Sequence, residues 1–154
     1  MKINSAVKEA SLILKKSFIK TPQLDSEILL GQVINKDREY IILNQDTNIG
    51  EESYNYFKNL IKQRSKGKPI AYLTGKKDFW KDQFRISEHV LIPRPDTEII
   101  VEQVLKITKF KSNLRVLDIG IGSGCILLSV LREKKDFRGI GIDISKKSIE
   151  ISKL

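Results

Sequence analysis

The chain has 154 residues, of which 40% are hydrophobic and 31% are charged, and these proportions are typical of a globular protein with a packed core. The sequence contains no run of about 18 apolar residues, so no transmembrane helix is predicted. It has a single cysteine and no signal-peptide pattern, which predicts a cytoplasmic protein without an internal disulfide. The formal net charge is +9, but the basic residues occur in ones and twos, which favours a solvated surface over a nucleic-acid site.

The first third of the chain has the periodicity of amphipathic helices. Apolar residues recur at three- and four-residue intervals between residues 3 and 18, 24 and 34, and 51 and 64. A short apolar piece, Tyr40 to Leu43, lies between the last two of these segments. The pattern predicts a small helical bundle over residues 1–68 and shows no catalytic constellation within it.

The composition changes at Ser65 to Pro69, and short β-like pieces are predicted from Ile70 onward. Phe79-Trp80 and Phe84 to Ile86 predict a β-hairpin joined by residues 81–83, within a linker of residues 69–92. After Pro93, Arg94 and Pro95, a helix is predicted to open at residues 96–98. Arg94 is a candidate either for contacting a substrate or for an ion pair within its loop.

Residues 93–154 predict an α/β segment whose centre is a glycine-rich loop. Val116 to Asp118 predicts a buried parallel strand, and the loop is followed by an apolar helix from Cys125. A second strand is predicted from Phe137 to Asp143, with Ser145 as the cap of a helix that starts at Lys146. A strand, a glycine loop and a helix in this order present backbone N–H groups to a nucleotide-like ligand.

Three ligands and a purely structural turn compete for this loop. The residues after Gly124 are Cys125 and Ile126, so the lysine and hydroxyl residue of a phosphate-binding P-loop are missing. Cys125 also stands where a dinucleotide fingerprint has its third glycine. The spacing fits S-adenosylmethionine better, with an acid on the second strand to accept from the ribose hydroxyls and Asp118 to hold the loop or the ligand amine. The predicted cofactor-binding residues are Gly120, Ile121, Gly122, Ser123, Gly124 and Asp143.

The motifs around this loop resemble those of a known enzyme family. Residues 118–124 and 141–145 resemble class I S-adenosylmethionine-dependent methyltransferases in general. Residues 69–75, Phe79-Trp80 and above all residues 91–98 (Leu-Ile-Pro-Arg-Pro-Asp-Thr-Glu) are similar to the HemK/PrmC family of release factor glutamine methyltransferases. Residues 24–30 and 36–38 in the helical region are similar as well, so the resemblance covers essentially the whole chain.

The resemblance implies an α/β fold in which a helical substrate-recognition domain precedes a Rossmann-like methyltransferase domain. It also implies methyl transfer from S-adenosylmethionine to the glutamine side-chain nitrogen in the Gly-Gly-Gln motif of class 1 peptide chain release factors. These release factors are the expected protein partners, and neither a membrane nor direct nucleic-acid contact is expected. In the family, an Asn-Pro-Pro-Tyr motif after the fourth strand holds the glutamine amide.

The sequence departs from the family in one respect that bears on activity. The prolines are Pro22, Pro69, Pro93 and Pro95, none of them after an asparagine, so no catalytic residue is assigned. No metal-ligand pattern surrounds the single histidine, His89. We expect a methyltransferase domain truncated after its second strand, inactive alone, with a C-terminal remainder of the enzyme as a further partner. The alternatives are a non-catalytic fragment that binds release factors or other translation components, and a nucleic-acid amine methyltransferase.

Overall fold

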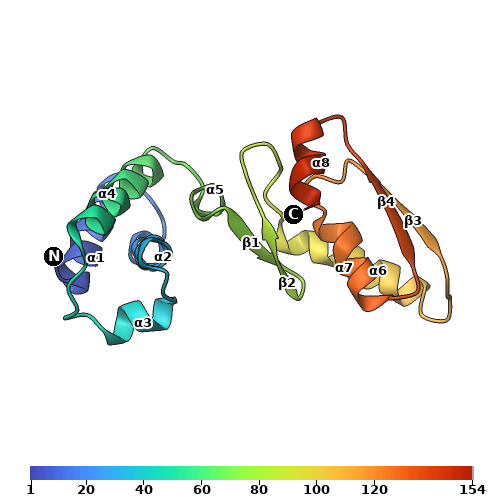
Figure 1. Cartoon of the computed structure of the whole chain (residues 1–154), viewed down its shortest axis with the longest axis horizontal. Helices are drawn as coiled ribbons and strands as arrows, with labels where there is room; N and C mark the ends of the chain where they lie inside the picture. Colours follow the sequence, from blue (N-terminus) through green and yellow to red (C-terminus); the bar gives the residue numbers. More distant parts are fainter. Residues whose placement is uncertain (154) are drawn as a thin grey trace. The chain divides into compact units, whose positions relative to one another are not determined.

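The computed structural model describes residues 1–153 and consists of two compact units, Met1–Thr74 and Gly75–Leu154 (Figure 1). Leu154, the last residue of the predicted methyltransferase segment, lies outside the described residues. The first unit contains five helices, α1 (Ile3–Lys16), α2 (Pro22–Ile34), α3 (Arg38–Leu43), α4 (Glu51–Ser65) and α5 (Ile70–Thr74). Among residues 1–153, no helix has the length and apolar character needed to span a membrane.

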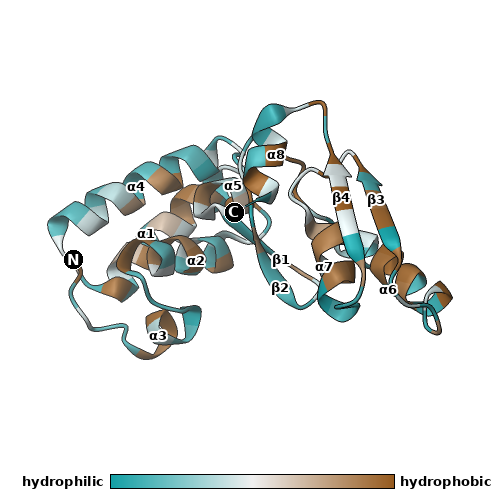
Figure 2. Cartoon of the chain, turned by 45° about the vertical axis from the view of Figure 1, so that its right-hand side comes forward, coloured by the Kyte–Doolittle hydropathy of each residue, from teal (hydrophilic) through white to brown (hydrophobic). Residues whose placement is uncertain are grey.

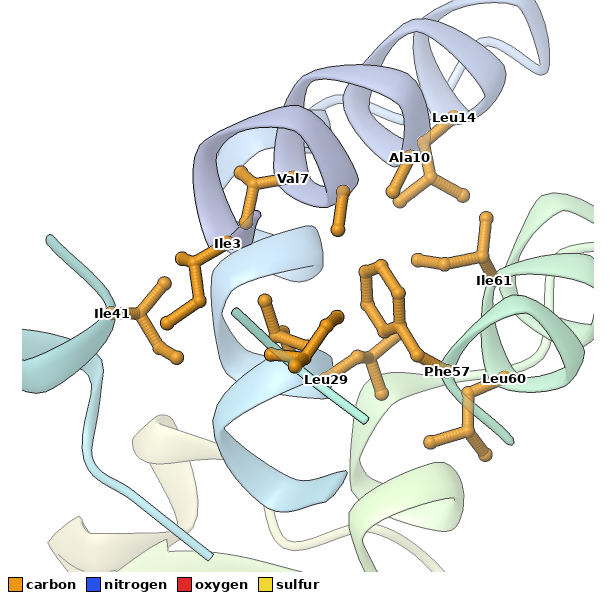
Figure 3. Close-up of a cluster of buried hydrophobic side chains, with 12 residues drawn as sticks. Ile3, Val7, Ala10, Leu14, Leu29, Ile41, Phe57, Leu60 and Ile61 are labelled. Carbon is orange, nitrogen blue, oxygen red and sulfur yellow. The ribbon is translucent and has the colours of Figure 1, made fainter. Parts of the chain in front are cut away.

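The helical unit is built around one apolar core, as its sequence periodicity predicts. Leu14 on α1 and Leu29 and Leu30 on α2 are fully buried. Phe57 and Ile61 on α4 point into the same cluster (Figure 3). Each buried leucine or phenylalanine contributes about 1.5–3 kcal/mol relative to an exposed one, so this core holds α1, α2 and α4 together.

The structure corrects or completes the expectation at three places in this unit. α2 begins at Pro22 rather than at Leu24. Proline is well suited to the first turn of a helix, because the backbone N–H that it lacks would have no partner within the helix there. The apolar piece around Tyr40 is the short helix α3, which Asp37 caps by accepting from the Tyr40 N–H at 2.7 Å. Ile70–Thr74, expected to be β-like, is the helix α5, which packs against α2 and α4.

The second unit combines a hairpin, helices and a small parallel sheet. Its elements are β1 (Lys76–Phe79), β2 (Asp82–Arg85), the 3-10 turn η1 (Pro95–Thr97), α6 (Glu98–Ile107), β3 (Arg115–Ile119), α7 (Cys125–Glu133), β4 (Arg138–Ile142) and α8 (Lys146–Ser152). The hairpin is present, but Trp80 and Lys81 alone connect its strands, since Phe79 pairs with Asp82. Trp80 adopts a φ of 58°, in the left-handed region that a two-residue turn requires.

The parallel sheet of β3 and β4 is covered on one face only. α7 packs against both strands on the side of Val116 and Gly139, which are register partners. On the opposite face, Leu117 and Ile119 are 58% and 76% exposed. No residue of β3 is fully buried, since Val116 and Asp118 are half-buried, so the prediction of a buried strand was wrong. Ile140 and Ile142 of β4 are exposed beside them, and the apolar colouring of the strands is visible in Figure 2.

Candidate cofactor site

The glycine loop connects the end of β3 to the start of α7. Gly120, Gly122 and Gly124 all have positive φ values, 82°, 55° and 82°, which side-chain-bearing residues rarely adopt. The N–H groups of Gly120 and Ile121 both donate to the Ile142 carbonyl, at 2.8 and 3.0 Å, so the loop is fastened to the end of β4. The Gly124 N–H closes the turn on the Ile121 carbonyl at 2.8 Å.

Asp143 connects this loop to the segment that follows β4. Its Oδ2 accepts from the Gly122 N–H at 3.0 Å, and its Oδ1 accepts from the Ser145 N–H at 2.8 Å. Ser145 in turn caps α8 by accepting from the Ser148 N–H. The structure therefore brings Asp143 against the predicted loop, although 21 positions separate it from Gly122.

Two glycines of β4 make room for the residues around the loop. A Cβ on Gly141 would lie 2.0 Å from Cδ1 of Ile121, and one on Gly139 would lie 2.8 Å from Cδ1 of Leu127 on α7. Neither position is among the predicted cofactor-binding residues. Glycines inside a strand are a signal of close approach by another segment, and this signal marks both residues.

The two acids at the strand ends have opposite electrostatic environments. Burial raises the pKa of the Asp118 carboxyl above its ordinary value of 3.8, the Leu127 backbone N–H opposes this shift, and the charge of Asp143 adds to it. The hydrogen bonds from the Ser145 and then the Gly122 backbone N–H hold the pKa of Asp143 below its ordinary value. Asp143 is therefore the acid that stays ionised most readily at this loop.

Cys125, Arg94 and His89 take no part in a catalytic constellation. Burial raises the pKa of the Cys125 thiol, which disfavours the thiolate that a nucleophile requires. Arg94 is exposed and forms no ion pair within residues 1–153. His89 is an exposed loop residue 3.2 Å from Lys147 Nζ, and the described residues contain no cluster of metal-ligating side chains.

The residues present have the features that a nucleoside-containing cofactor requires. A Cβ on Gly120 would meet no atom within 4 Å, and one on Gly122 would meet only the Gly120 carbonyl at 3.9 Å, so bare backbone faces open space. Each carboxylate oxygen of Asp143 uses one of its two lone pairs on a backbone N–H and keeps acceptor capacity for a hydroxyl group. The loop therefore permits the close approach of a ligand, and the acid beside it suits a ribose diol.

Comparison with known proteins shows what the chain is similar to. Residues 5–75 match the PrmC N-terminal domain. A release factor glutamine methyltransferase from Buchnera aphidicola subsp. Baizongia pistaciae is 44% identical over 152 residues, which are 99% of this chain and 54% of the relative. One from Leptospira interrogans is 40% identical over 97% of this chain and 53% of the relative. The chain is therefore similar to release factor glutamine methyltransferases over nearly its whole length, and its helical unit is similar to the PrmC N-terminal domain.

The chain spans about half the length of the curated relatives named above. A bifunctional methyltransferase from Rickettsia conorii is also similar, with 36% identity over 98% of this chain and 33% of that longer protein. The matched N-terminal domain corresponds to the helical unit. The similarity to the Buchnera relative covers 99% of this chain, so it includes the glycine loop as well as the helical unit.

Proposed function

We propose that this chain supplies the helical domain and the cofactor loop of an S-adenosylmethionine-dependent release factor glutamine methyltransferase. The observation that carries the proposal is the glycine loop closed on Asp143, in a chain whose relatives are named release factor glutamine methyltransferases. Since release factors act on ribosomes, this function belongs to translation termination and to the cytoplasm.

The roles of individual residues follow from the loop geometry. The backbone of Gly120 to Gly124, with Ile121 and Ser123 between the glycines, would lie against the cofactor, and Asp143 would accept from its ribose hydroxyls. The cofactor, when bound, supplies an electrophilic methyl group on a sulfonium centre. The glutamine amide nitrogen is a weak nucleophile, so the rate depends on holding it in line with that methyl group. No residue of this chain is proposed to do this, because the Asn-Pro-Pro-Tyr motif is absent from the sequence.

Calorimetry with S-adenosylhomocysteine tests the cofactor loop directly. Gly120→Asn would place a side chain in the open space above the loop, and asparagine tolerates positive φ, so the fold is expected to survive while binding is lost. Gly67→Asn is the matched control, since Gly67 also has a positive φ and open surroundings but lies after α4. Equal binding by both variants would contradict the assignment of the loop.

Incubation with a release factor and labelled S-adenosylmethionine tests the enzyme part of the proposal. We expect the chain alone to transfer no methyl groups, because the residues that hold the glutamine amide in the family are missing. Robust incorporation by the chain alone would show that the Asn-Pro-Pro-Tyr motif is dispensable. Binding of a release factor without binding of S-adenosylhomocysteine would favour the second candidate, a non-catalytic fragment that recognises release factors.

A further inference from the structure

Basic side chains gather at one end of the second unit, where α6 and α7 end and β3 and β4 begin (Figure 1). Two separate segments form this end, residues 106–115 and residues 134–138, and together they contain seven basic residues and one acidic residue. Six of the basic residues are exposed and form no ion pair within residues 1–153. This basic end consists of Lys106, Lys109, Lys111, Arg115, Lys135 and Arg138.

Hydrogen bonds between the two segments hold the basic end together. The Lys134 ammonium donates to the carbonyls of Thr108 and Lys109, at 3.0 and 3.3 Å, and so connects the end of α7 to the end of α6. The Asn113 N–H donates to Asp136 Oδ2 at 2.6 Å, which connects the two loops that lead into β3 and β4. Lys134 and Asp136 are therefore used by the fold itself, and the six residues of the basic end remain for a partner.

Arg115 and Arg138 are the members of the basic end that the fold explains least. They are register partners at the starts of β3 and β4, so their side chains leave the sheet side by side on the same face. Like charges placed opposite each other destabilise a pair of strands. A helix C-terminus attracts cations and accounts for Lys106 in the last turn of α6, but the two arginines stand at strand starts. The arginine pair is unfavourable for the fold by itself and favourable for a phosphate, which a guanidinium group binds through two N–H groups.

Phe110 adds an open aromatic ring to the basic end. Its side chain is 94% exposed, so its ring takes no part in the core of the unit. The Lys109 ammonium lies 5.3 Å from the centre of this ring. A nucleic-acid base can stack on such a ring while the phosphate next to that base pairs with the ammonium group.

We propose that the basic end binds single-stranded nucleic acid, with phosphates on its lysines and arginines and a base stacked on Phe110. The basic residues stand in ones and twos along the chain, which favoured a solvated surface and no direct nucleic-acid contact, but the fold brings two such segments together. The proposal does not rest on the proposed function, since the basic end lies at the starts of the strands and the glycine loop follows the end of β3.

Other partners with negative charges suit these side chains less well. A nucleic-acid duplex keeps its bases stacked on one another and would leave the Phe110 ring unused. Helices that lie on a membrane bury a whole apolar face, whereas Phe110 and Ile107 are the large apolar side chains that the two segments expose. An acidic protein surface would pair with the charges but offers no planar group for the ring.

Fluorescence anisotropy with a labelled single-stranded oligouridine tests the contribution of the charges. We expect Lys109→Glu with Lys111→Glu to weaken binding about tenfold or more. Lys16→Glu with Lys20→Glu is the matched control, because it changes the net charge equally at exposed lysines of the helical unit, and it should weaken binding less than about twofold. Each phosphate contact adds about 0.7 to the slope of log affinity against log salt, so the Lys109/Lys111 variant should lose about 1.4 of this slope.

A second pair of variants tests the aromatic ring. We expect Phe110→Ala to weaken oligouridine binding about fivefold or more, since a stacked base is lost. Phe18→Ala is the matched control, because Phe18 is also 94% exposed but belongs to the helical unit, and it should leave the affinity unchanged. Oligodeoxythymidine of the same length shows whether RNA or DNA binds more tightly, and duplex RNA should compete poorly with either.

Several outcomes would overturn the proposal. No binding of either oligonucleotide by the wild-type chain, or equal losses in the two lysine pairs, would remove the basic end as a site. An unchanged affinity of Phe110→Ala would contradict a single-stranded ligand. Displacement of the oligouridine by poly-glutamate of equal charge would favour an acidic protein, and tighter binding to phosphatidylglycerol vesicles would favour a membrane. Circular dichroism checks that each variant is folded, and S-adenosylhomocysteine binding, which reports on the proposed function, should be the same in all of them.

Discussion

Asp25 and Arg64 form the most buried ion pair among the described residues. Arg64 Nε lies 2.7 Å from Asp25 Oδ2, with side-chain exposures of 17% and 5%. The second carboxylate oxygen accepts from Thr21 Oγ1 at 2.8 Å, and Arg64 also donates to the Lys68 carbonyl at 3.0 Å. The pair therefore joins α2 to α4 and to the residues just after it, and both carboxylate oxygens of Asp25 accept a hydrogen bond.

Removal of one partner should be costly because it leaves the other charge buried and unpaired. We expect Asp25→Ala to lower the free energy of unfolding of the helical unit by about 3 kcal/mol. Asp46→Ala is the control, since Asp46 pairs with Lys2 at the surface and is 92% exposed, and it should leave the stability unchanged. Urea titration followed by circular dichroism measures both. Equal effects of the two substitutions would contradict the importance of the buried pair.

Asp118 and Asp143 should titrate in a defined order as the pH falls. The pKa of Asp118 is raised by burial and by the charge of Asp143, so Asp118 takes up its proton first. The pKa of Asp143 is lower in the folded state than in the unfolded state, so ionised Asp143 stabilises the fold. This contribution is fully present at pH values above the unfolded-state pKa of about 3.9, and it is lost as the pH falls through the folded-state pKa.

Carboxyl carbon shifts in an NMR titration measure this order for the two side chains. Asp143→Asn removes the neighbouring charge and should lower the pKa of Asp118 toward its ordinary value. Protonation of Asp143 before Asp118 would show that the Gly122 and Ser145 hydrogen bonds do not hold the carboxylate in solution.

At the scale of elements, the β1–β2 hairpin is fastened by carboxylates from two helices. Glu98, at the start of α6, accepts from the Trp80 backbone N–H at 2.8 Å. Glu133, at the end of α7, accepts from the Trp80 indole at 2.9 Å and pairs with Lys81 at 2.7 Å. The hydrogen bond from the Lys81 side chain is the main reason that the pKa of Glu133 lies below its ordinary value. These contacts give Glu98, the last residue of the Pro-Arg-Pro-Asp-Thr-Glu motif, a structural role.

The only tryptophan of the chain lies in this turn, so intrinsic fluorescence reports on the hairpin. We expect Glu98→Ala and Glu133→Ala each to shift the Trp80 emission to longer wavelength, because the half-buried indole becomes more hydrated when the turn loosens. Glu102→Ala changes an exposed acid of the same helix, and it should leave the spectrum as it is. An unchanged spectrum in all three variants would contradict the anchoring role.

At the scale of the whole molecule, the two units differ in how completely their apolar surfaces are covered. The helical unit encloses a core with fully buried leucines. In the second unit, Leu117, Ile119, Ile140 and Ile142 lie on one exposed face of a two-stranded sheet. Two strands without cover on both faces give a parallel sheet little independent stability.

Hydrogen exchange should therefore divide the chain by unit. We expect slow exchange for backbone amides in α1, α2 and α4, and much faster exchange for those in β3 and β4. Mass spectrometry of peptides after timed exposure to heavy water measures this difference. Uniformly slow exchange across both units would show that the open sheet is more stable than its exposed face predicts.

The local signals in the sequence were sufficient for much of this fold. Helical periodicity located α1, α2 and α4, since burial of one helix face depends on residues three and four apart. The glycines at alternate positions located the loop, because glycine adopts a positive φ readily and this preference does not depend on distant residues. The same local reasoning was wrong for residues 70–74, where packing against α2 and α4 selects a helix, and for the burial of β3.

By itself, the sequence determined the helical bundle, the glycine loop and the acid that follows the second strand, because each depends on periodicity or on single-residue conformations. Only the tertiary structure decided that Asp143 bonds to Gly122, that Gly141 makes space for Ile121, and that Trp80 is held from α7, 53 positions away. Contacts between such distant residues depend on how strands and helices pack in three dimensions, and no local pattern of side chains encodes that geometry.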